Sequence, residues 1–203
     1  MAFGKSGRPT EDRLARQQEI YGAVAPMILS NGVRLLSMQA AAQTAYMSIG
    51  GLYHYFPNKR ALVLHALQPE VVIRCCQDFQ AVYGHLLHEQ PAQYLNAKLN
   101  FMVEQIDFRR PSVHAALELG STTFWEVIEA SFSAGLTEFN ASFARCYPDV
   151  DEERRWQMSR SLRRAMVAAL LDKHTTSEDL LEELQALIVG YLEIDMAHMA
   201  TPA

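Results

Sequence analysis

Apolar residues recur every three or four positions along nearly the whole chain, and no segment alternates apolar and polar residues as a half-buried strand does. The spacing predicts a helix over Glu11–Asn31, with Thr10 as its N-cap and Gly32 as the residue that ends it. Two short helices are expected next, over about 37–44 and 48–56, each beginning with a serine cap.

A further helix is predicted to begin near Lys59, and the rest of the chain reads as a series of longer amphipathic helices. Their expected ranges are roughly 70–89, 91–109, 112–119, 122–146, 151–173 and 176–200. The sequence therefore predicts an all-α protein of about nine helices. We expect an N-terminal domain of three helices with a helix-turn-helix over residues 1–67, and a larger helical domain over 68–203.

Composition narrows the class of protein. The apolar fraction is 49% and the charged fraction 20%, which is typical of a globular chain, and no apolar run approaches the ~18 residues that a membrane span needs. The three cysteines are odd in number and two are adjacent, which argues against a disulfide framework and for a reducing compartment. We expect a cytoplasmic protein, with no membrane partner and no signal peptide.

Charge is distributed unevenly between the two expected domains. Residues 1–67 hold seven basic and three acidic residues, a net charge of +4, whereas the remainder holds eleven basic and twenty acidic residues, a net charge of −9. A polyanion is therefore attracted to the first domain and repelled by the second. This charge asymmetry becomes informative because residues 1–67 also contain a recognisable motif.

Two short helices joined by a three-residue turn match the helix-turn-helix arrangement, whose second helix lies in the major groove of DNA. The stretch GLYHYFPNKRALVLHAL, residues 51–67, closely resembles the DNA-binding domain of the TetR family of bacterial transcriptional regulators. The resemblance covers about a quarter of the chain. It implies a homodimer that binds an operator in double-stranded DNA, with a cavity for an unknown small-molecule effector.

The resemblance also implies roles for single residues. Tyr53, Lys59 and Ser37 match positions that contact DNA phosphates. The second helix offers no Arg, Asn or Gln for bidentate base contacts, so we expect its glycines to let the backbone approach DNA closely. The predicted DNA-contacting set is Ser37, Gln39, Ser48, Ile49, Gly50, Gly51, Tyr53, His54 and Lys59.

Tyr46 is a departure from the family pattern, which usually has glycine at this point of the turn. A tyrosine in the left-handed region is uncommon. Either the turn takes another shape, or it keeps its shape and Tyr46 is strained.

Homodimerisation is expected through the last two helices, which carry small and apolar residues suited to close packing across a two-fold axis. The alternative is that these residues are ordinary core positions of one subunit. The predicted interface residues are Trp156, Leu162, Arg163, Met166, Leu170, Leu184, Leu187, Ile188 and Tyr191.

The effector cavity is expected among the four segments between residues 70 and 146. The predicted lining is Phe79, Tyr83, Phe101, Met102, Gln105, Phe108, His114, Leu117, Trp125, Ile128 and Phe132, although apolar residues at this spacing also build ordinary cores. His85 and His88 lie three positions apart but have no visible further ligand, so no metal site or cofactor is predicted.

The sequence contains no nucleophile–base pair, phosphate-binding glycine loop or other catalytic constellation, so we expect no enzyme activity. The leading hypothesis is a transcriptional regulator, most simply a repressor that binds a palindromic operator as a dimer and is released by its effector. The alternative is a helical carrier or sensor of small molecules that does not bind DNA sequence-specifically.

Overall fold

The computed structural model describes residues 12–172 and 174–192, and within these ranges the chain is helical with no strand. It contains eleven α-helices and one 3-10 helix, η1. The α-helices are α1 Arg13–Leu35, α2 Met38–Thr44, α3 Ile49–Tyr55, α4 Lys59–Val63, α5 Pro69–Tyr83, α6 Leu86–Glu89, α7 Pro91–Glu104, α8 Ile106–Leu119, α9 Ser121–Cys146, α10 Glu152–Leu171 and α11 Ser177–Leu192, while η1 is His65–Leu67. The all-α prediction is confirmed.

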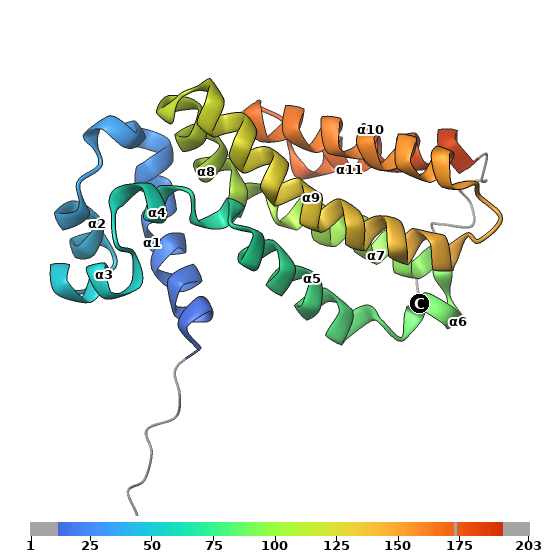
Figure 1. Ribbon diagram of the computed structural model, residues 1–203, viewed down its shortest axis with the longest axis horizontal. Helices are drawn as coiled ribbons and strands as arrows, with labels where there is room; N and C mark the ends of the chain where they lie inside the picture. Colours follow the sequence, from blue (N-terminus) through green and yellow to red (C-terminus); the bar gives the residue numbers. More distant parts are fainter. Residues whose placement is uncertain (1–11, 173, 193–203) are drawn as a thin grey trace, which may run out of the picture.

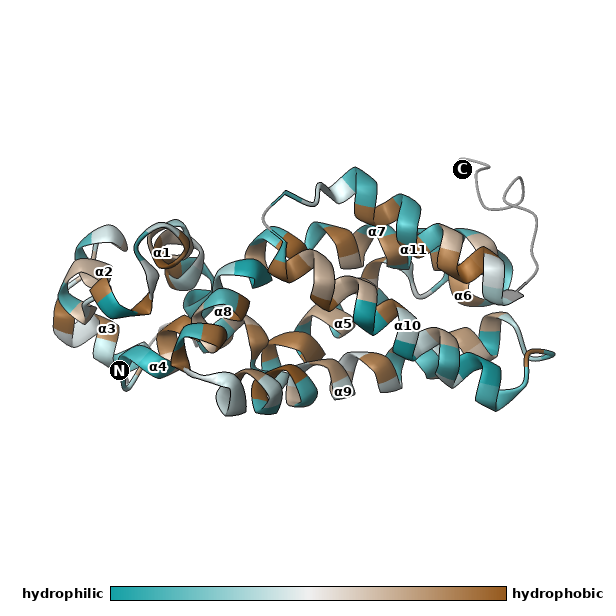
Figure 2. Ribbon diagram, turned by 90° about the horizontal axis from the view of Figure 1, so that it is seen from above, coloured by the Kyte–Doolittle hydropathy of each residue, from teal (hydrophilic) through white to brown (hydrophobic). Residues whose placement is uncertain are grey.

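The molecule is elongated, with helices α1–α4 at one end and a bundle of the longer helices at the other (Figure 1). In the bundle α10 packs against both α9 and α11, and α7 packs against α11. The two ends are joined chiefly by α1 and α8, which share an extensive contact. Figure 2 shows hydrophobic and hydrophilic positions alternating along the bundle helices, as expected for helices with one face in a core.

The first helix begins and ends through local hydrogen bonding. Asp12 is its N-cap and accepts hydrogen bonds from the backbone N–H groups of Leu14 and Ala15 at 3.1 and 3.2 Å. The predicted cap, Thr10, lies outside the described residues, and the cap role belongs to Asp12 instead. Gly32 has φ 72° and interrupts the helix, as predicted.

Three of the expected helices, 70–89, 91–109 and 112–119, have different boundaries. The segment predicted as 70–89 is divided at Gly84, where an added Cβ would lie 2.5 Å from the carbonyl oxygen of Gln80. The break predicted at Arg110-Pro111 is absent, because Pro111 lies inside α8 and is buried. The chain breaks instead at Gln105, whose N–H bonds to the Val103 carbonyl in a tighter turn. A proline costs the helix one hydrogen bond, and burial of its ring offsets part of that loss.

The main hydrophobic core runs without interruption from α1 and α3 into the bundle, from Ile20 and Leu52 to Leu184 and Ile188. A smaller cluster is centred on Phe79, with Leu87 and Tyr94. Because buried side chains are continuous across residue 67, the division of the chain at that point stays a prediction. None of the helices in the described ranges is both long and apolar enough to cross a membrane.

Candidate DNA-binding surface and ligand cavity

The two helices of the helix-turn-helix begin at serine caps, as predicted. The Ser37 hydroxyl accepts a hydrogen bond from the Ala40 N–H at 3.1 Å, and the Ser48 hydroxyl accepts one from the Gly51 N–H at 3.0 Å. Each cap satisfies one of the backbone donors that a helix leaves unpaired at its start. The caps therefore fix where α2 and α3 begin.

The other end of α3 is held by α1. Arg13 donates to the His54 carbonyl at 2.5 Å, and Gln17 donates to the Tyr55 carbonyl at 2.8 Å. These bonds satisfy carbonyls that have no partner within the helix. Leu52 and Phe56 are buried at 0% and 1% exposure and anchor the inner face of α3. The role of Arg13 and Gln17 was not predicted, because it depends on residues about forty positions apart.

The opposite face of α3 is exposed to solvent. Tyr53 and Ile49 are 49% and 42% exposed, and Gly50 has open space where a Cβ would lie. No contact within the protein therefore requires glycine at position 50. The exposed members of the predicted DNA-contacting set are Ser37, Gln39, Ser48, Ile49, Gly50, Tyr53 and His54, and Gly51 is half-buried.

Lys59 is placed differently from the rest of that set. It is half-buried, and its ammonium donates to the carbonyls of Val33 and Leu36 at 2.8 and 3.1 Å. Because α1 ends at Leu35, these carbonyls have no partners further along the helix. The ammonium thus ties α4 to the end of α1, and a phosphate contact from its third N–H stays a prediction.

Tyr46, in the turn between α2 and α3, has φ 52° and is 98% exposed. Of the two possibilities left by the sequence, the structure shows the strained one, in which the turn keeps a left-handed residue. A non-glycine residue in this conformation costs about 1–2 kcal/mol. The exposed ring makes no packing contact large enough to offset that cost.

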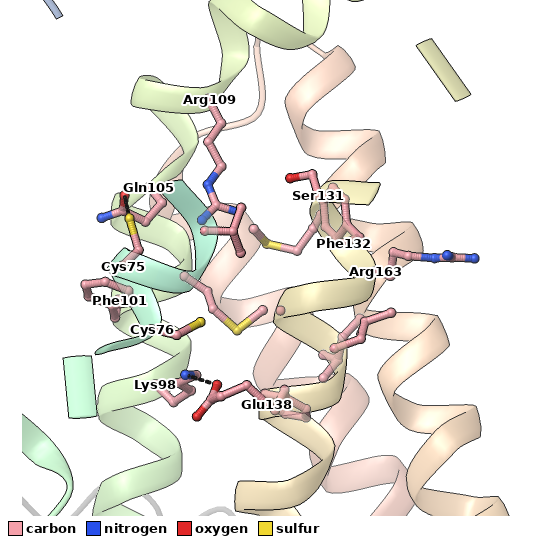
Figure 3. A pocket seen from close by; sticks show the side chains of 17 residues that line it. Cys75, Cys76, Lys98, Phe101, Gln105, Arg109, Ser131, Phe132, Glu138 and Arg163 are labelled. Carbon is pink, nitrogen blue, oxygen red and sulfur yellow. Dashed lines mark hydrogen bonds and ion pairs between the residues drawn. The ribbon is translucent and has the colours of Figure 1, made fainter. Parts of the chain in front are cut away.

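A cavity lies in the bundle among α5, α7, α8, α9 and α10, with an unfilled volume of about 60 Å³ (Figure 3). Four predicted lining residues are there: Phe101, Met102, Gln105 and Phe132. The others that line it were not predicted: Val72, Cys75, Cys76, Lys98, Arg109, Ser131, Gly135, Leu136, Glu138, Phe139, Leu162, Arg163 and Met166.

The remaining predicted ligand residues lie outside this cavity. Phe79 and Tyr83 pack their rings together in the smaller cluster, and Phe108 packs edge-on against Tyr21 of α1. Leu117 and Trp125 are 42% and 64% exposed, whereas Ile128 is a core residue with 3% exposure. His114 is half-buried and is also absent from the lining. Helical spacing identified apolar faces but not which of them border the same space.

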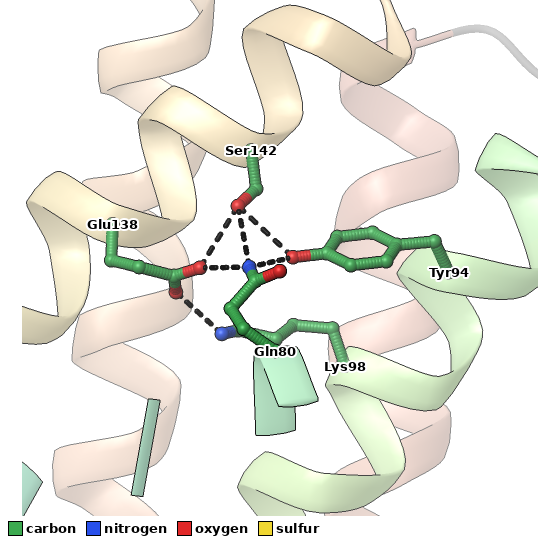
Figure 4. Close-up of polar contacts among 5 residues, drawn as sticks. All are labelled: Gln80, Tyr94, Lys98, Glu138 and Ser142. Atoms are coloured by element: carbon green, nitrogen blue, oxygen red, sulfur yellow. Dashed lines mark hydrogen bonds and ion pairs between the residues drawn. The ribbon is translucent and has the colours of Figure 1, made fainter. Parts of the chain in front are cut away.

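One end of the cavity is closed by a buried polar network (Figure 4). Lys98, with 4% exposure, forms an ion pair with Glu138 and lies 4.5 Å from the centre of the Phe79 ring. Gln80 donates to Glu138 at 2.8 Å, and Ser142 donates to the same carboxylate at 2.9 Å. Burial raises the pKa of Glu138, but Lys98 and these hydrogen bonds outweigh it and hold the pKa below its usual value.

At the other end, Arg109 reaches from α8 toward the middle of the cavity (Figure 3). Its Nε atom is buried without a hydrogen-bond partner, and so is the Oγ atom of Ser131 on α9. Burial lowers the pKa of Arg109, and the neighbouring Cys75 and Cys76 sulfurs only partly oppose that effect. Burial likewise raises the pKa of both thiols, so they are not activated nucleophiles.

Comparison with known proteins agrees with this geometry. Residues 25–66 match the family model described as bacterial regulatory proteins, tetR family. The match covers the helix-turn-helix part of the chain, which is therefore similar to the corresponding part of tetR-family regulators. A comparison with curated proteins finds no match to this sequence.

Several solved structures share the fold over most of the chain. Salmonella enterica GusR is 19% identical with a TM-score of 0.59, over 92% of this chain and 100% of that one. The fatty acid degradation regulator FadR from Bacillus halodurans is 16% identical with a TM-score of 0.60, over 93% and 100%. Thermus thermophilus PfmR is 16% identical with a TM-score of 0.54, over 84% and 95%.

The last two helices, α10 and α11, bury most of their large apolar residues within one subunit. Leu162, Met166, Leu170, Leu184 and Ile188 are 0–2% exposed, so they already contact the subunit's own core. Trp156, Arg163, Leu187 and Tyr191 remain half-buried and accessible. A shallow groove on α11 is lined by Glu183, Ala186, Leu187, Gly190 and Tyr191.

Helix α8 connects the helix-turn-helix end of the molecule to the cavity. Ser112 donates to the Tyr21 hydroxyl at 2.8 Å and accepts from the Ala66 N–H at 3.3 Å. Further along the helix, Glu118 accepts from the Val33 N–H at 2.8 Å. Arg109 lies one turn before Ser112. A single helix therefore borders the cavity and hydrogen-bonds both α1 and η1.

Proposed function

We propose that this chain is a TetR-family repressor that binds a palindromic operator as a homodimer and is released when a small molecule fills the cavity. The observation that carries the proposal is the exposed outer face of α3, which is capped by Ser48 and held at its other end by Arg13 and Gln17. Such a preformed, uncovered helix suits insertion into the major groove.

The contacts we propose with DNA are of two kinds. The hydroxyl groups of Ser37 and Tyr53 and the third N–H of Lys59 would hold phosphates, which sets orientation without reading sequence. Base readout would come from Ile49, His54 and Gln39, with the bare backbone at Gly50 allowing close approach. A single domain of this kind binds weakly, and two on a two-fold axis read half-sites about one helical turn, ~34–36 Å, apart.

We place the dimer interface on the accessible side of α10 and α11. Trp156, Leu187 and Tyr191 are half-buried in one subunit, and exposed Ala186 and Gly190 leave room for a partner helix. Small residues beside an aromatic ring allow two helices to approach closely. The five residues that already fill the core would support this surface from behind.

Release by the effector would pass through α8. A ligand bound beside Arg109 changes the DNA affinity only if it binds one orientation of α8 better than the other. Because Ser112 and Glu118 hydrogen-bond η1 and α1, a movement of α8 is transmitted to the domain that carries α3. The connecting segment Leu62–Gln77, which contains η1, would move with it.

The test is a fluorescence-anisotropy titration with duplex DNA from upstream of the gene that encodes this chain, beside a scrambled duplex. We expect the upstream duplex to bind at least ~10³-fold more tightly. Tyr53→Phe should weaken binding about fivefold through loss of one hydrogen bond. The matched control is Tyr83→Phe, a partly exposed tyrosine on α5.

Equal affinity for the two duplexes would contradict the proposal. If the protein still bound small molecules in that case, the result would favour the alternative function, a helical carrier or sensor without sequence-specific DNA binding.

A further inference from the structure

The α8 end of the cavity contains two buried polar atoms without hydrogen-bond partners. They are Nε of Arg109 and Oγ of Ser131, and Ser131 is only 1% exposed. Figure 3 shows the Ser131 hydroxyl on the side of its helix that faces Arg109. Buried polar groups are almost always paired in folded proteins, so two unpaired donors that border one cavity indicate a missing partner.

The charge of Arg109 is also uncompensated. The other cations around the cavity have partners: Lys98 pairs with Glu138, and Arg163 pairs with Glu129 at 2.9 Å. The neighbouring Arg110 pairs with Asp107 at 3.0 Å. Within residues 12–172 and 174–192 no carboxylate forms an ion pair with Arg109. Arg109 as a whole is half-buried, but its Nε atom is shielded from solvent. A shielded charge without a counter-ion is costly, and such groups are typical of ligand sites.

The rest of the wall is apolar and adaptable. Phe101 and Phe132 provide aromatic surface, and Met102 and Met166 are unbranched side chains that repack easily. The unfilled volume of about 60 Å³ is small beside the ~300–1,000 Å³ of common ligand pockets. An occupant larger than a few heavy atoms must therefore displace the methionines. The far end is closed by the Lys98–Glu138 pair, which is neutral as a whole.

We propose that the cavity binds an organic monocarboxylate, with its carboxylate held by Arg109 and Ser131 and its apolar body against Met102 and Met166. The guanidinium presents parallel N–H groups that match the two oxygens of a carboxylate, and the hydroxyl supplies one more donor. This names the class of effector for the proposed regulator, so its consequence for DNA rests on that function. Binding itself requires no DNA.

The test compares carboxylates with their uncharged amides on the full-length protein without DNA. The probes are hexanoate, decanoate and phenylacetate, each beside its primary amide, measured by thermal shift and by calorimetric titration. We expect at least one carboxylate to stabilise the protein and to bind about tenfold or more tightly than its amide. If no carboxylate bound better than its amide, the proposal would be overturned.

Variants place the effect at the proposed site. Arg109→Gln should abolish the preference for the carboxylate, and Ser131→Ala should weaken carboxylate binding several-fold. Arg163→Gln is the matched control, because Arg163 also lines the cavity but already has a carboxylate partner. A preference that survived Arg109→Gln, or that Arg163→Gln removed equally, would contradict the assignment.

A purely structural role for Arg109 predicts the opposite stability change. If Arg109 serves a ligand, Arg109→Met should raise the melting temperature of the ligand-free protein, because it removes an unpaired buried charge. A lower melting temperature would indicate a structural role and overturn the proposal. Failure of the regulator function would show separately, as carboxylate binding by a protein that does not distinguish its upstream DNA from a scrambled duplex.

Discussion

In the helix-turn-helix, the side chains of Tyr53 and His54 are exposed to solvent. In the cavity, by contrast, Nε of Arg109 and Oγ of Ser131 are buried away from solvent. Water satisfies the exposed groups, so leaving this surface without a partner costs the fold little. The buried groups have no such replacement. The two regions therefore differ in how much free energy the fold loses when nothing is bound to them.

The same contrast separates the two ends of the cavity. Lys98 and Arg109 are both cations on its wall, but Lys98 belongs to a network of five side chains and Arg109 has no anionic partner in the described chain. Removing one partner of a buried ion pair destabilises the fold, whereas removing an unpaired shielded charge stabilises it. Substitutions in the two regions should therefore change stability by different amounts and with different signs.

The largest effect is expected at the paired end. Lys98→Met should lower the free energy of unfolding by about 3 kcal/mol, because it leaves the half-buried Glu138 carboxylate without its cation. Urea unfolding followed by circular dichroism measures the change. The double variant with Lys98→Met and Glu138→Gln removes both charges and keeps the amide oxygen as an acceptor, so it should regain much of the loss.

If the double variant were as unstable as Lys98→Met alone, the unpaired carboxylate would not be the cause. The contrast drawn between Lys98 and Arg109 would then fail.

A smaller effect is expected from His65, which lies between the two regions. It is 3% exposed and packed against the rings of Tyr21 and Phe56, and burial lowers its pKa from 6.5 to about 4. The folded protein keeps His65 neutral at pH values where the unfolded chain binds a proton. Its contribution to stability is therefore complete above pH 6.5 and is lost as the pH falls toward 4.

Between pH 7 and pH 5 the free energy of unfolding should fall by about 2 kcal/mol through this residue. Urea unfolding at the two pH values, with wild type beside His65→Leu, isolates the contribution. An equal fall in both proteins would show that His65 is not its source.

The smallest change in stability is expected at Tyr46, an exposed residue whose backbone is strained. Its side chain is in water, but its backbone is strained at φ 52°. Tyr46→Gly should raise the free energy of unfolding by about 1 kcal/mol, since glycine adopts this conformation without strain. Tyr53→Phe, measured beside it by urea unfolding, should leave stability within about 0.5 kcal/mol. A loss of stability in Tyr46→Gly would mean that the ring makes a favourable contact.

The sequence predicted most of the DNA-binding domain because the signals there are local. The caps at Ser37 and Ser48, the left-handed Gly32 and the buried Leu52 and Phe56 all follow from spacing within a few residues. The predicted cap at Thr10 failed by two positions, since Asp12 offers the same chemistry.

The cavity was predicted only in part because its lining depends on how distant helices pack. Arg109, Lys98 and Glu138 come from three helices, and nothing in their local sequence shows which of them faces a partner. The helix break lies at Gln105 and not at Arg110-Pro111, and Leu117 of α8 is 42% exposed and does not line the cavity. The dimer residues show the same limit, because helical spacing does not separate a core stripe from an interface.

The link between the cavity and DNA is tested most directly by operator affinity, measured by anisotropy with and without a saturating concentration of the most stabilising carboxylate. Wild type should bind the upstream duplex about 5–150-fold more weakly when the ligand is present. Glu118→Gln with Ser112→Ala should bind both the ligand and the DNA but show a smaller ratio. An affinity that is the same with and without the bound ligand would contradict the coupling through α8.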